Sequence, residues 1–452
     1  MNWDLIFHQY DIRGIYPTQL NEDTYYILGR ALATYLKAGD IAVGYDTRLS
    51  SPTLFKAFTS GIADQGLDVV SLGLTSTEIN YFASGKYGFT ANAIISASHN
   101  PAEYNGLKIV TKGVIPLNGD FGLPEIKKLA KANKFTSPVR KGQISNLNVT
   151  DDWINHVLKF IDISKLRKLK VVIDAGNGMG GLSWEKLKKK LPLDIIPLYF
   201  KPDGHFPHHL PDPLKPENVI DLQHEIKKHK ADLGFAIDGD ADRIFVLDEH
   251  GISVSGTIAT AMLSQYLLQE SGPSTILYNA VCGKIVPETV KLFKGIPIRV
   301  RVGHSYIKEQ MKKENALFAG EHSGHFYFRE NFFADSSTVA GLLLLEYISK
   351  QNKPLSEITK NFDKYFSSGE INYNVSDGQK VIEAIEKQFQ DSNTDFIDGL
   401  SVWYPKWWFS LRTSNTEPMV RLNLEADTQE ILDEKLSLVD NELRQMGAHR
   451  NE

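Results

Sequence analysis

The run Ser-Ala-Ser-His-Asn-Pro at residues 96–101 contains the side chains with the clearest potential for chemistry in this chain. An apolar segment, residues 93–95, precedes it, and a polar loop leads from it towards Lys108. The pattern predicts a buried strand that delivers the hydroxyl of Ser98 into a turn, which Pro101 helps to fix. A hydroxyl held there is placed to react with a ligand. An ordinary turn would show the same pattern, so three further loops are needed to decide.

The second loop has carboxylates at alternate positions, Asp238, Asp240 and Asp242, directly after an apolar strand pattern. Hard anionic oxygens held together favour Mg²⁺ or Ca²⁺, because without a cation they repel each other. An exposed acidic turn is the plain alternative. An EF-hand would use Glu249 as its twelfth residue, but Arg243 stands where that loop needs glycine. The pattern therefore favours a Mg²⁺ that keeps one site open for a phosphate oxygen.

The third loop, Gly-Glu-His-Ser-Gly-His at residues 320–325, also follows an apolar segment. Glu321 and Ser323 offer acceptors for adjacent sugar hydroxyls, and the glycines permit close approach of the backbone. A polar turn is the alternative interpretation. His322 and His325 also suggest a metal site, but the sequence around them supplies no pattern for a third ligand.

The fourth loop runs from Arg412 to Pro418, after a pattern typical of a strand. Arg412 can bind phosphate through two hydrogen bonds, while the side chains and backbone amides of Ser414, Asn415 and Thr416 surround the anion. A turn that satisfies its own polar groups is again the alternative.

A glycine-rich run at residues 176–181 matches the dinucleotide pattern G-x-G-x-x-G, with Asp194 at a tolerable distance for a ribose contact. One such match is weak, and a tight turn from strand to helix is the preferred interpretation. A dehydrogenase would rest on this pattern alone and would leave the Asp238 loop unexplained. The absence of a Walker A sequence disfavours an ATP-driven kinase.

The composition places limits on compartment and partners. The 42% hydrophobic and 23% charged content is ordinary for a soluble protein, and a net charge of -5 without a long basic run gives no sign of a nucleic-acid surface. The single cysteine, Cys282, excludes an internal disulfide and fits a reducing compartment. No secretory signal and no apolar stretch long enough for a bilayer are visible. We therefore expect a cytoplasmic protein that binds neither nucleic acid nor membrane.

Short apolar runs alternate with longer helical patterns, which is typical of α/β architecture, and 452 residues are too many for one core. In the first three quarters of the chain, apolar strands run into polar loops of small residues, which suggests related α/β domains. The expected domains are residues 1–146, 147–251, 252–366 and 367–452. The expected strands are residues 41–44, 69–72, 93–96, 171–174, 233–237, 244–247, 275–278 and 298–302. The expected helices include residues 25–37, 52–65, 184–191 and 428–446.

Together, a nucleophilic hydroxyl, a divalent-metal loop, a hydroxyl-binding loop and a phosphate cradle indicate phosphoryl transfer on a sugar phosphate. With these four motifs in this order, the chain resembles the α-D-phosphohexomutase superfamily along its whole length. It is most similar to the bacterial phosphomannomutase/phosphoglucomutase branch, because Asn415 stands where phosphoglucosamine mutases usually have glycine. The loop at Glu321 also favours this branch, because phosphoglucosamine mutases have a glutamine-containing sugar loop there. The resemblance implies three similar mixed α/β domains and a smaller α+β C-terminal domain around a central cleft.

The resemblance also implies roles for residues. Ser98 would be a phosphoserine, and Mg²⁺ would bind one phosphoserine oxygen together with Asp238, Asp240 and Asp242. Lys108 and Arg13 would assist proton transfer and stabilise charge. His304 would be an acid–base candidate, with a packed histidine as the alternative. The implied substrate-binding residues are Tyr10, His99, Arg243, Lys284, Glu321, Ser323, Arg412, Ser414, Asn415 and Thr416, with His99 expected to orient the serine loop rather than to act as a base.

The implied reaction has two phosphoryl transfers. Phospho-Ser98 gives its group to the free hydroxyl of a hexose monophosphate (mannose, glucose or both), and then takes back the other phosphate of the resulting hexose 1,6-bisphosphate. The alternatives are a phosphoglucosamine mutase and a non-catalytic sugar-phosphate-binding protein, which would not need Ser98. The sequence predicts neither a preference between mannose and glucose nor an oligomeric state.

Overall fold

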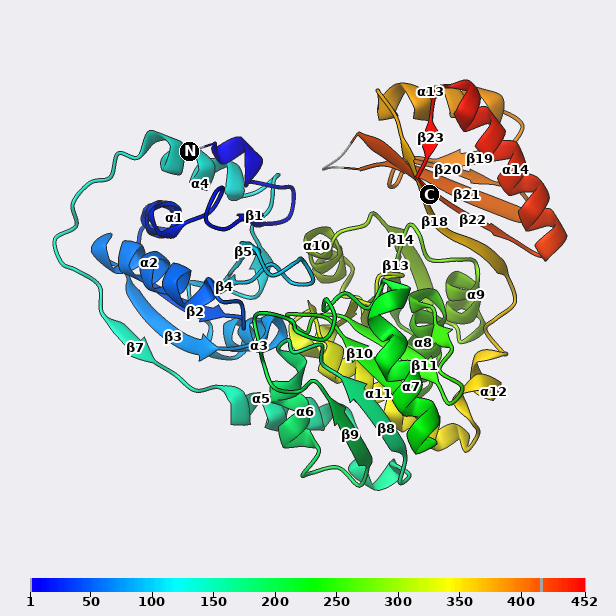
Figure 1. Ribbon diagram of the computed structural model, residues 1–452, viewed down its shortest axis with the longest axis horizontal. Coiled ribbons are helices and arrows are strands. Elements are labelled where there is room, and N and C mark those ends of the chain that lie inside the picture. Colours follow the sequence, from blue (N-terminus) through cyan, green and yellow to red (C-terminus); the bar gives the residue numbers. More distant parts are fainter. Residues whose placement is uncertain (1, 415–417, 452) are drawn as a thin grey trace.

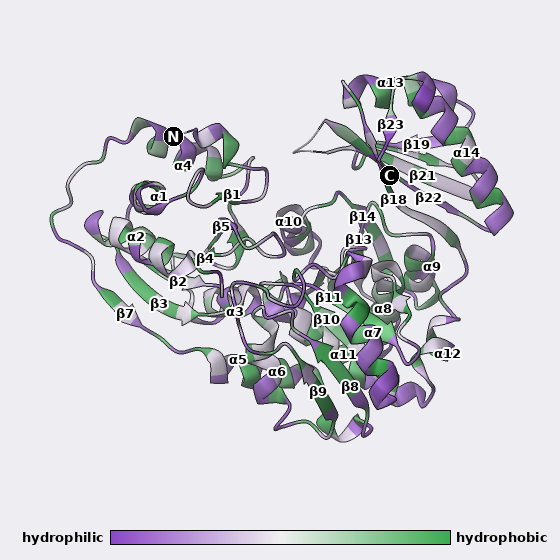
Figure 2. Ribbon diagram, viewed as in Figure 1, coloured by the Kyte–Doolittle hydropathy of each residue, from purple (hydrophilic) through white to green (hydrophobic). Residues whose placement is uncertain are grey.

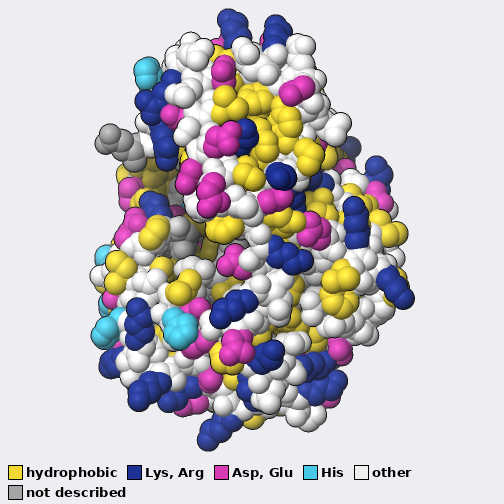
Figure 3. Space-filling view, turned by 90° about the vertical axis from the view of Figure 1, so that its right-hand side faces the viewer, with side chains coloured by type: hydrophobic (Ala, Val, Ile, Leu, Met, Phe, Trp, Pro, Cys, Tyr) yellow, Lys and Arg dark blue, Asp and Glu magenta, His cyan; other side chains and the backbone are white. Residues whose placement is uncertain are grey.

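The computed structural model describes residues 2–414 and 418–451, which form four β-sheets in order along the chain (Figure 1). The strands are largely hydrophobic, and the outer faces of helices such as α7 (Ile220–His229) are hydrophilic (Figure 2). On the face seen in Figure 3, basic and acidic side chains are interspersed. None of the described helices is long and apolar enough to cross a membrane.

The first sheet has seven strands, and the loop that contains Ser98 follows its strand β4. In spatial order its strands are β1 (Ile12–Ile15), β5 (Tyr104–Thr111), β4 (Ala91–Ile95), β2 (Asp40–Tyr45), β3 (Asp68–Leu74) and β7 (Ile144–Asn146), and β6 (Ile115–Pro116) pairs with β5. Its helices are α1 (Glu22–Leu36), α2 (Ser51–Asp64), α3 (Thr77–Tyr87) and α4 (Leu123–Ala132). Every residue of β4 is buried, as expected for an inner strand covered on both faces.

The second and third sheets follow. The second has the order β12 (Ser253–Val254), β11 (Ile244–Asp248), β10 (Leu233–Ile237), β8 (Lys170–Asp174), β9 (Asp194–Leu198). The third has the order β14 (Ile296–Val300), β13 (Thr275–Asn279), β15 (Phe318–Gly320), β16 (Phe326–Phe328), β17 (Ala334–Asp335). With α7, the helices of this region are α5 (Thr150–Val157), α6 (Gly180–Leu187), α8 (Gly256–Ser271), α9 (Ile285–Leu292), α10 (His304–Glu314), α11 (Ser337–Gln351) and α12 (Leu355–Thr359).

These three sheets share one design. In each, a middle strand (β2, β8 or β13) pairs in parallel with two neighbours, one of which (β4, β10 or β15) then pairs antiparallel with the next strand. The loop that leaves β4, β10 or β15 contains Ser98, Asp238 or Glu321, respectively. Three of the four candidate loops therefore occupy the same place in three similar domains, at the carboxyl end of a strand, where α/β sheets bind ligands.

The C-terminal sheet has six strands, and all of its pairings are antiparallel. Its order is β19 (Asn393–Asp395), β20 (Leu400–Trp403), β21 (Trp407–Thr413), β22 (Met419–Ala426), β18 (Phe366–Asn374), β23 (His449–Arg450), and its helices are α13 (Gly378–Gln388) and α14 (Gln429–Gln445). Leu411 and Leu422 pack with both helices in one buried cluster. The predicted fold class, three similar α/β domains and a smaller α+β domain, is confirmed. The boundaries at residues 146, 251 and 366 stay predictions.

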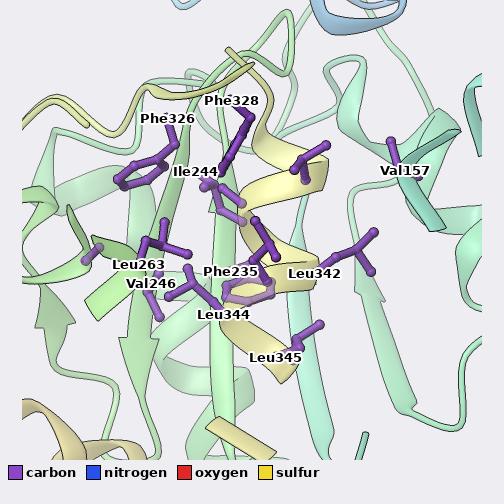
Figure 4. Packing of buried hydrophobic residues seen from close by; sticks show 14 of the residues in the cluster. Val157, Phe235, Ile244, Val246, Leu263, Phe326, Phe328, Leu342, Leu344 and Leu345 are labelled. Carbon is purple, nitrogen blue, oxygen red and sulfur yellow. The ribbon is translucent and has the colours of Figure 1, made fainter. Parts of the chain in front are cut away.

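The largest hydrophobic core is continuous across the second and third sheets. Helix α11 lies between them, with Leu344 beside Phe235 of the second sheet and with Phe326 and Phe328 of the third sheet in the same cluster (Figure 4). The first sheet contributes Ala42 and Leu72 to this core and also has a second cluster, whereas the C-terminal sheet has a separate cluster. The loops that contain Asp238 and Glu321 are therefore held by one packed unit.

Glu78 joins three domains. It lies fully buried on α3, where its carboxylate accepts hydrogen bonds from Ser336 and Thr338 at the start of α11 and from Ser183 on α6. Burial raises the pKa of Glu78 to about 7. Because this pKa lies above that of an unfolded glutamate, the folded protein binds a proton more tightly, and its stability falls as the pH rises towards 7.

We expect Glu78→Gln, which cannot ionise, to lose this pH dependence. Between about pH 5 and about pH 8 the free energy of unfolding of the unsubstituted protein should fall by about 3 kcal/mol more than that of the variant. Urea unfolding of both proteins across this range measures the difference. Parallel pH profiles would contradict the prediction.

Candidate active site

The loop that contains Ser98 is held in one unusual conformation. The backbone of Ser98 has a φ of 52°, in the left-handed region that residues other than glycine rarely adopt. Arg48, whose side chain is fully buried, donates hydrogen bonds to four backbone carbonyls of this loop. They belong to Ser98, Asn100, Pro101 and Tyr104, at 2.8, 2.6, 2.5 and 3.0 Å. Bonds from a charged donor keep the strained loop, and therefore the hydroxyl, in place.

The serine loop and the Asp238 loop touch. Ser98 Oγ lies 3.0 Å from Asp238 Oδ2 and 3.2 Å from Nδ1 of His99, so the ring of His99 does face the hydroxyl. A Cβ atom on Gly239 would come within 2.3 Å of the carbonyl oxygen of Ser98. The glycine of the Asp-Gly-Asp sequence is therefore needed for this close approach.

Asp238, Asp240 and Asp242 form a compact, buried set of acceptors. Each offers an oxygen within 4.8 Å of the others. Burial, opposed by Arg243 and reinforced by Asp242, raises the pKa of Asp238 to about 7. Oδ1 of Asp240 and Oδ1 of Asp242 are buried and have no hydrogen-bond partner among the described residues. Buried, mutually repelling carboxylates with unused oxygens fit a hard divalent cation.

Two cations flank this set. Lys108 on β5 places its Nζ 2.6 Å from Asp240 and 2.8 Å from Asp242. Burial opposes its charge, but the two carboxylates outweigh burial and raise the pKa of Lys108 well above its usual value. Arg243 donates from Nε to Asp238 at 2.9 Å, while its Nη2 is buried without a partner among the described residues. Lys108 is thus a permanent cation, and Arg243 keeps a donor available.

Arg13, Tyr10 and His304 lie where the first and third domains meet. Arg13 donates to Asn100 of the serine loop at 2.6 Å. The ring of Tyr10 lies 6.0 Å from that of His304, the first residue of α10. Burial, together with Lys308 and Lys108, lowers the pKa of His304 to about 3, so the imidazole is uncharged at neutral pH.

A row of charged side chains behind the Asp238 loop is not predicted by the sequence. His325 Nδ1 lies 3.0 Å from Asp335 and 3.7 Å from Asp242. The fully buried Lys308 contacts Asp335 at 2.7 Å and lies 3.5 Å from Nδ1 of His304. The sequence suggests for His325 only a metal site, and it supplies no pattern for a third ligand. Asp335 comes close only because β16 and β17 fold back antiparallel, which no local pattern predicts.

The Glu321 loop adjoins the Asp238 loop. The amide of Ile244 donates to the carbonyl of Gly324 at 3.1 Å, and Arg243 forms an isolated bridge with His325. Glu321 itself is buried and accepts hydrogen bonds from Asn279 at 3.1 Å and Tyr327 at 2.5 Å. Ser323 is half-buried in the same turn.

The remaining candidates lie on or beside the C-terminal domain. Lys284, just before α9, has its Nζ 3.1 Å from the carbonyl of Pro405 and 3.4 Å from Asp427. Arg412 lies on β21, Ser414 directly follows that strand, and Asn415 and Thr416 lie outside the described residues. Among residues 2–414 and 418–451, no hydrogen bond links Lys284 or Arg412 to the Ser98 or Asp238 loops.

The glycine-rich run at residues 176–181 is a packing turn. A Cβ atom on Gly178 would approach the carbonyl oxygen of Gly239 to 2.6 Å, and one on Gly181 would approach that of Phe200 to 2.1 Å. Helix α6 begins at Gly180. The interpretation as a strand-to-helix turn is confirmed. The turn packs directly against the backbone of the Asp238 loop at Gly239.

Comparison with known proteins agrees with this geometry. Models of the phosphoglucomutase/phosphomannomutase family match the chain in four parts. These are α/β/α domain I at residues 4–137, domain II at 151–251, domain III at 255–365 and the C-terminal domain at 370–440. A phosphomannomutase from Escherichia coli is 38% identical over 435 residues, covering 93% of this chain and 95% of that protein.

Other relatives span the chain equally well. A phosphomannomutase from Methanocaldococcus jannaschii is 37% identical over 449 residues, 98% of each chain. Among solved structures, a phosphoglucomutase/phosphomannomutase family protein from Burkholderia thailandensis superimposes with a TM-score of 0.90 at 29% identity, covering 99% of this chain and 98% of the other. The chain belongs to the phosphoglucomutase/phosphomannomutase family and is a hexose phosphate mutase.

Proposed function

We propose that this mutase interconverts the 6-phosphate and the 1-phosphate of mannose, glucose or both, through a phosphoserine at Ser98 and a hexose 1,6-bisphosphate. The observation that carries the proposal is the contact of Ser98 Oγ with Asp238, next to two buried carboxylate oxygens that have no hydrogen-bond partner in the described part of the chain. A hydroxyl that carries a phosphoryl group between two ends of a sugar needs this combination of a fixed nucleophile and a cation site.

Asp238, Asp240 and Asp242 are the residues that would hold Mg²⁺, which when bound neutralises charge on the transferring phosphoryl group. A structure of N-acetylphosphoglucosamine mutase from Aspergillus fumigatus, with the same fold at 14% identity and a TM-score of 0.63, contains GlcNAc-6P and magnesium. In this chain Nη2 of Arg243, which has no hydrogen-bond partner within residues 2–414 and 418–451, is available to donate to a phosphoryl oxygen. Lys108 keeps the carboxylates of Asp240 and Asp242 in place.

The proton of the attacking sugar hydroxyl needs an acceptor. The two histidines of the site, His304 and His325, differ in their pKa and therefore in how well they can accept it. A group with a pKa of about 3 takes up a proton poorly, so we assign hydrogen bonding to the sugar to His304. His325 has one ring nitrogen held by Asp335, and contact with Asp242 and Asp335 raises its pKa despite burial. We assign proton transfer to His325 and charge stabilisation to Arg13 and Lys108.

Substrate recognition is divided between two domains. The Glu321 loop adjoins the reacting groups and would contact sugar hydroxyls, whereas Arg412 and the following loop would hold the phosphate that is not reacting. Because the bisphosphate must turn over between the two transfers, this cradle has to accept a phosphate from either end of the sugar.

The test is a comparison of kcat/KM for mannose 1-phosphate, glucose 1-phosphate and glucosamine 1-phosphate in a coupled assay. We expect the value for mannose or glucose 1-phosphate to exceed that for glucosamine 1-phosphate by at least about tenfold. A preference for glucosamine 1-phosphate would instead identify a phosphoglucosamine mutase.

A further inference from the structure

Lys308 on α10 is a fully buried lysine in the wall of the site. Its Nζ forms an ion pair of 2.7 Å with Asp335, and it lies 4.0 Å from the centroid of the Tyr81 ring and 5.7 Å from that of Tyr327. Burial lowers the pKa of Lys308, because a charge is costly to remove from water. The carboxylate and the electron-rich faces of the two rings favour the charged form. These surroundings therefore hold Lys308 as a cation.

The ammonium group of Lys308 faces one particular nitrogen of His304. The two residues are four positions apart on α10, so their side chains lie on the same side of the helix. Nζ of Lys308 lies 3.5 Å from Nδ1 of His304, whose imidazole is uncharged at neutral pH. An ammonium group has donors only, and a protonated Nδ1 would point one N–H group at another. Nδ1 therefore carries the lone pair, and the proton of the ring lies on Nε2.

The other nitrogen, Nε2 of His304, is left for a ligand. Within the part of the chain that the structure describes, it has no hydrogen-bond partner. The ring of His325 is held in the opposite way, because its Nδ1 lies 3.0 Å from Oδ2 of Asp335. A carboxylate only accepts hydrogen bonds, so Nδ1 of His325 carries a proton and Nε2 of the neutral ring is an acceptor. The two histidines thus differ in what they offer: His304 a donor, His325 an acceptor.

We propose that Lys308 is a positioning residue that fixes His304 in the tautomer with its proton on Nε2, and thereby makes this histidine a hydrogen-bond donor to an oxygen of the hexose. The inference rests on the proposed contact of His304 with the sugar. Because Nε2 of the fixed tautomer has no lone pair, His304 does not compete with His325 for the proton of the attacking hydroxyl. Lys308 thereby keeps orientation of the sugar and proton transfer on separate histidines.

NMR of protein labelled with ¹⁵N in its histidine rings tests the tautomer directly. The resonances of His304 are those that His304→Gln removes. In the unsubstituted protein at neutral pH, Nε2 of His304 should be protonated and Nδ1 unprotonated. Lys308→Met removes the ammonium group and keeps a side chain of similar length. It should move both resonances towards those of a ring that exchanges between its two tautomers, and kcat/KM for the hexose phosphate should fall about tenfold.

Two further variants separate the ammonium group from a general effect of packing. Lys308→Gln keeps a donor without the charge, so its tautomer and its kcat/KM should lie closer to those of the unsubstituted protein. Lys350→Met is the matched control. Lys350 on α11 lies 2.8 Å from Glu270 and 4.8 Å from the centroid of the Tyr266 ring, in surroundings of the same kind but outside the site. This variant should change neither the resonances of His304 nor kcat/KM.

The outcomes separate the inference from the proposed function. A proton on Nδ1 of His304 in the unsubstituted protein overturns the inference. A loss of activity in Lys308→Met with an unchanged tautomer also overturns it, because the role of Lys308 would then be structural. If the tautomer changes and kcat/KM does not fall, Lys308 fixes the ring, but the proposed contact of His304 with the sugar is wrong. If melting temperatures show that Lys308→Met does not fold, the unsubstituted protein and Lys308→Gln decide.

Discussion

Ser98→Ala is expected to abolish mutase turnover and to leave the fold intact. The substitution removes the proposed phosphoryl carrier, so kcat should fall by at least about 10⁴-fold. It removes the hydrogen bond to Asp238 and the contact with Nδ1 of His99, whereas the four bonds from Arg48 go to backbone carbonyls and remain. The loss of stability should therefore be about 1 kcal/mol. A coupled assay and thermal unfolding measure the two effects.

Intact-protein mass spectrometry adds a direct readout. The purified protein should carry the mass of one phosphate, and Ser98→Ala should not. Ser96→Ala is the matched control, because it removes a buried hydroxyl that accepts from the amide of Ser98 at 3.0 Å but cannot carry the phosphoryl group itself. It should keep the phosphate and lose at most about tenfold in activity. A phosphate retained in Ser98→Ala, or near-normal turnover, would falsify the proposal.

The parts of the site that the sequence predicts are those whose chemistry is local. Asp238, Asp240 and Asp242 lie within five consecutive positions, and Ser98 directly follows a buried strand, so residue type and spacing identify both. The sequence also suggests that the first three domains are related, because in each of them an apolar strand is followed directly in the chain by a polar loop.

The parts that the sequence does not predict depend on register and distant contacts. Arg48 reaches the serine loop from fifty residues upstream, between β2 and α2, and its surroundings show no pattern that indicates four carbonyl acceptors. Glu370 and Arg421 approach Arg412 only through the order of strands in the C-terminal sheet. Lys284, expected among the substrate contacts, touches Asp427 because the third and C-terminal domains meet there.

Removal of divalent cations is expected to abolish activity and to lower the melting temperature. Among the described residues, Oδ1 of Asp240 and Oδ1 of Asp242 have no hydrogen-bond partner, and the mutual repulsion of the three carboxylates contributes to the raised pKa of Asp238. A cation that binds this set in the folded state alone stabilises that state, by about 3 kcal/mol at a hundredfold excess over its Kd. Treatment with EDTA followed by addition of Mg²⁺ should restore both turnover and melting temperature.

Asp240→Asn separates cation binding from a general effect of ionic strength. The variant keeps a side chain of the same size near Lys108 and Thr77 but loses one negative charge of the set. Mg²⁺ should then neither restore turnover nor raise the melting temperature, whereas Asp433→Asn, on exposed α14, should respond like the unsubstituted protein. If Mg²⁺ shifts all three proteins equally, the cation acts elsewhere. Because the thermal shift does not depend on turnover, it tests the cation site even if the assignment of Ser98 fails.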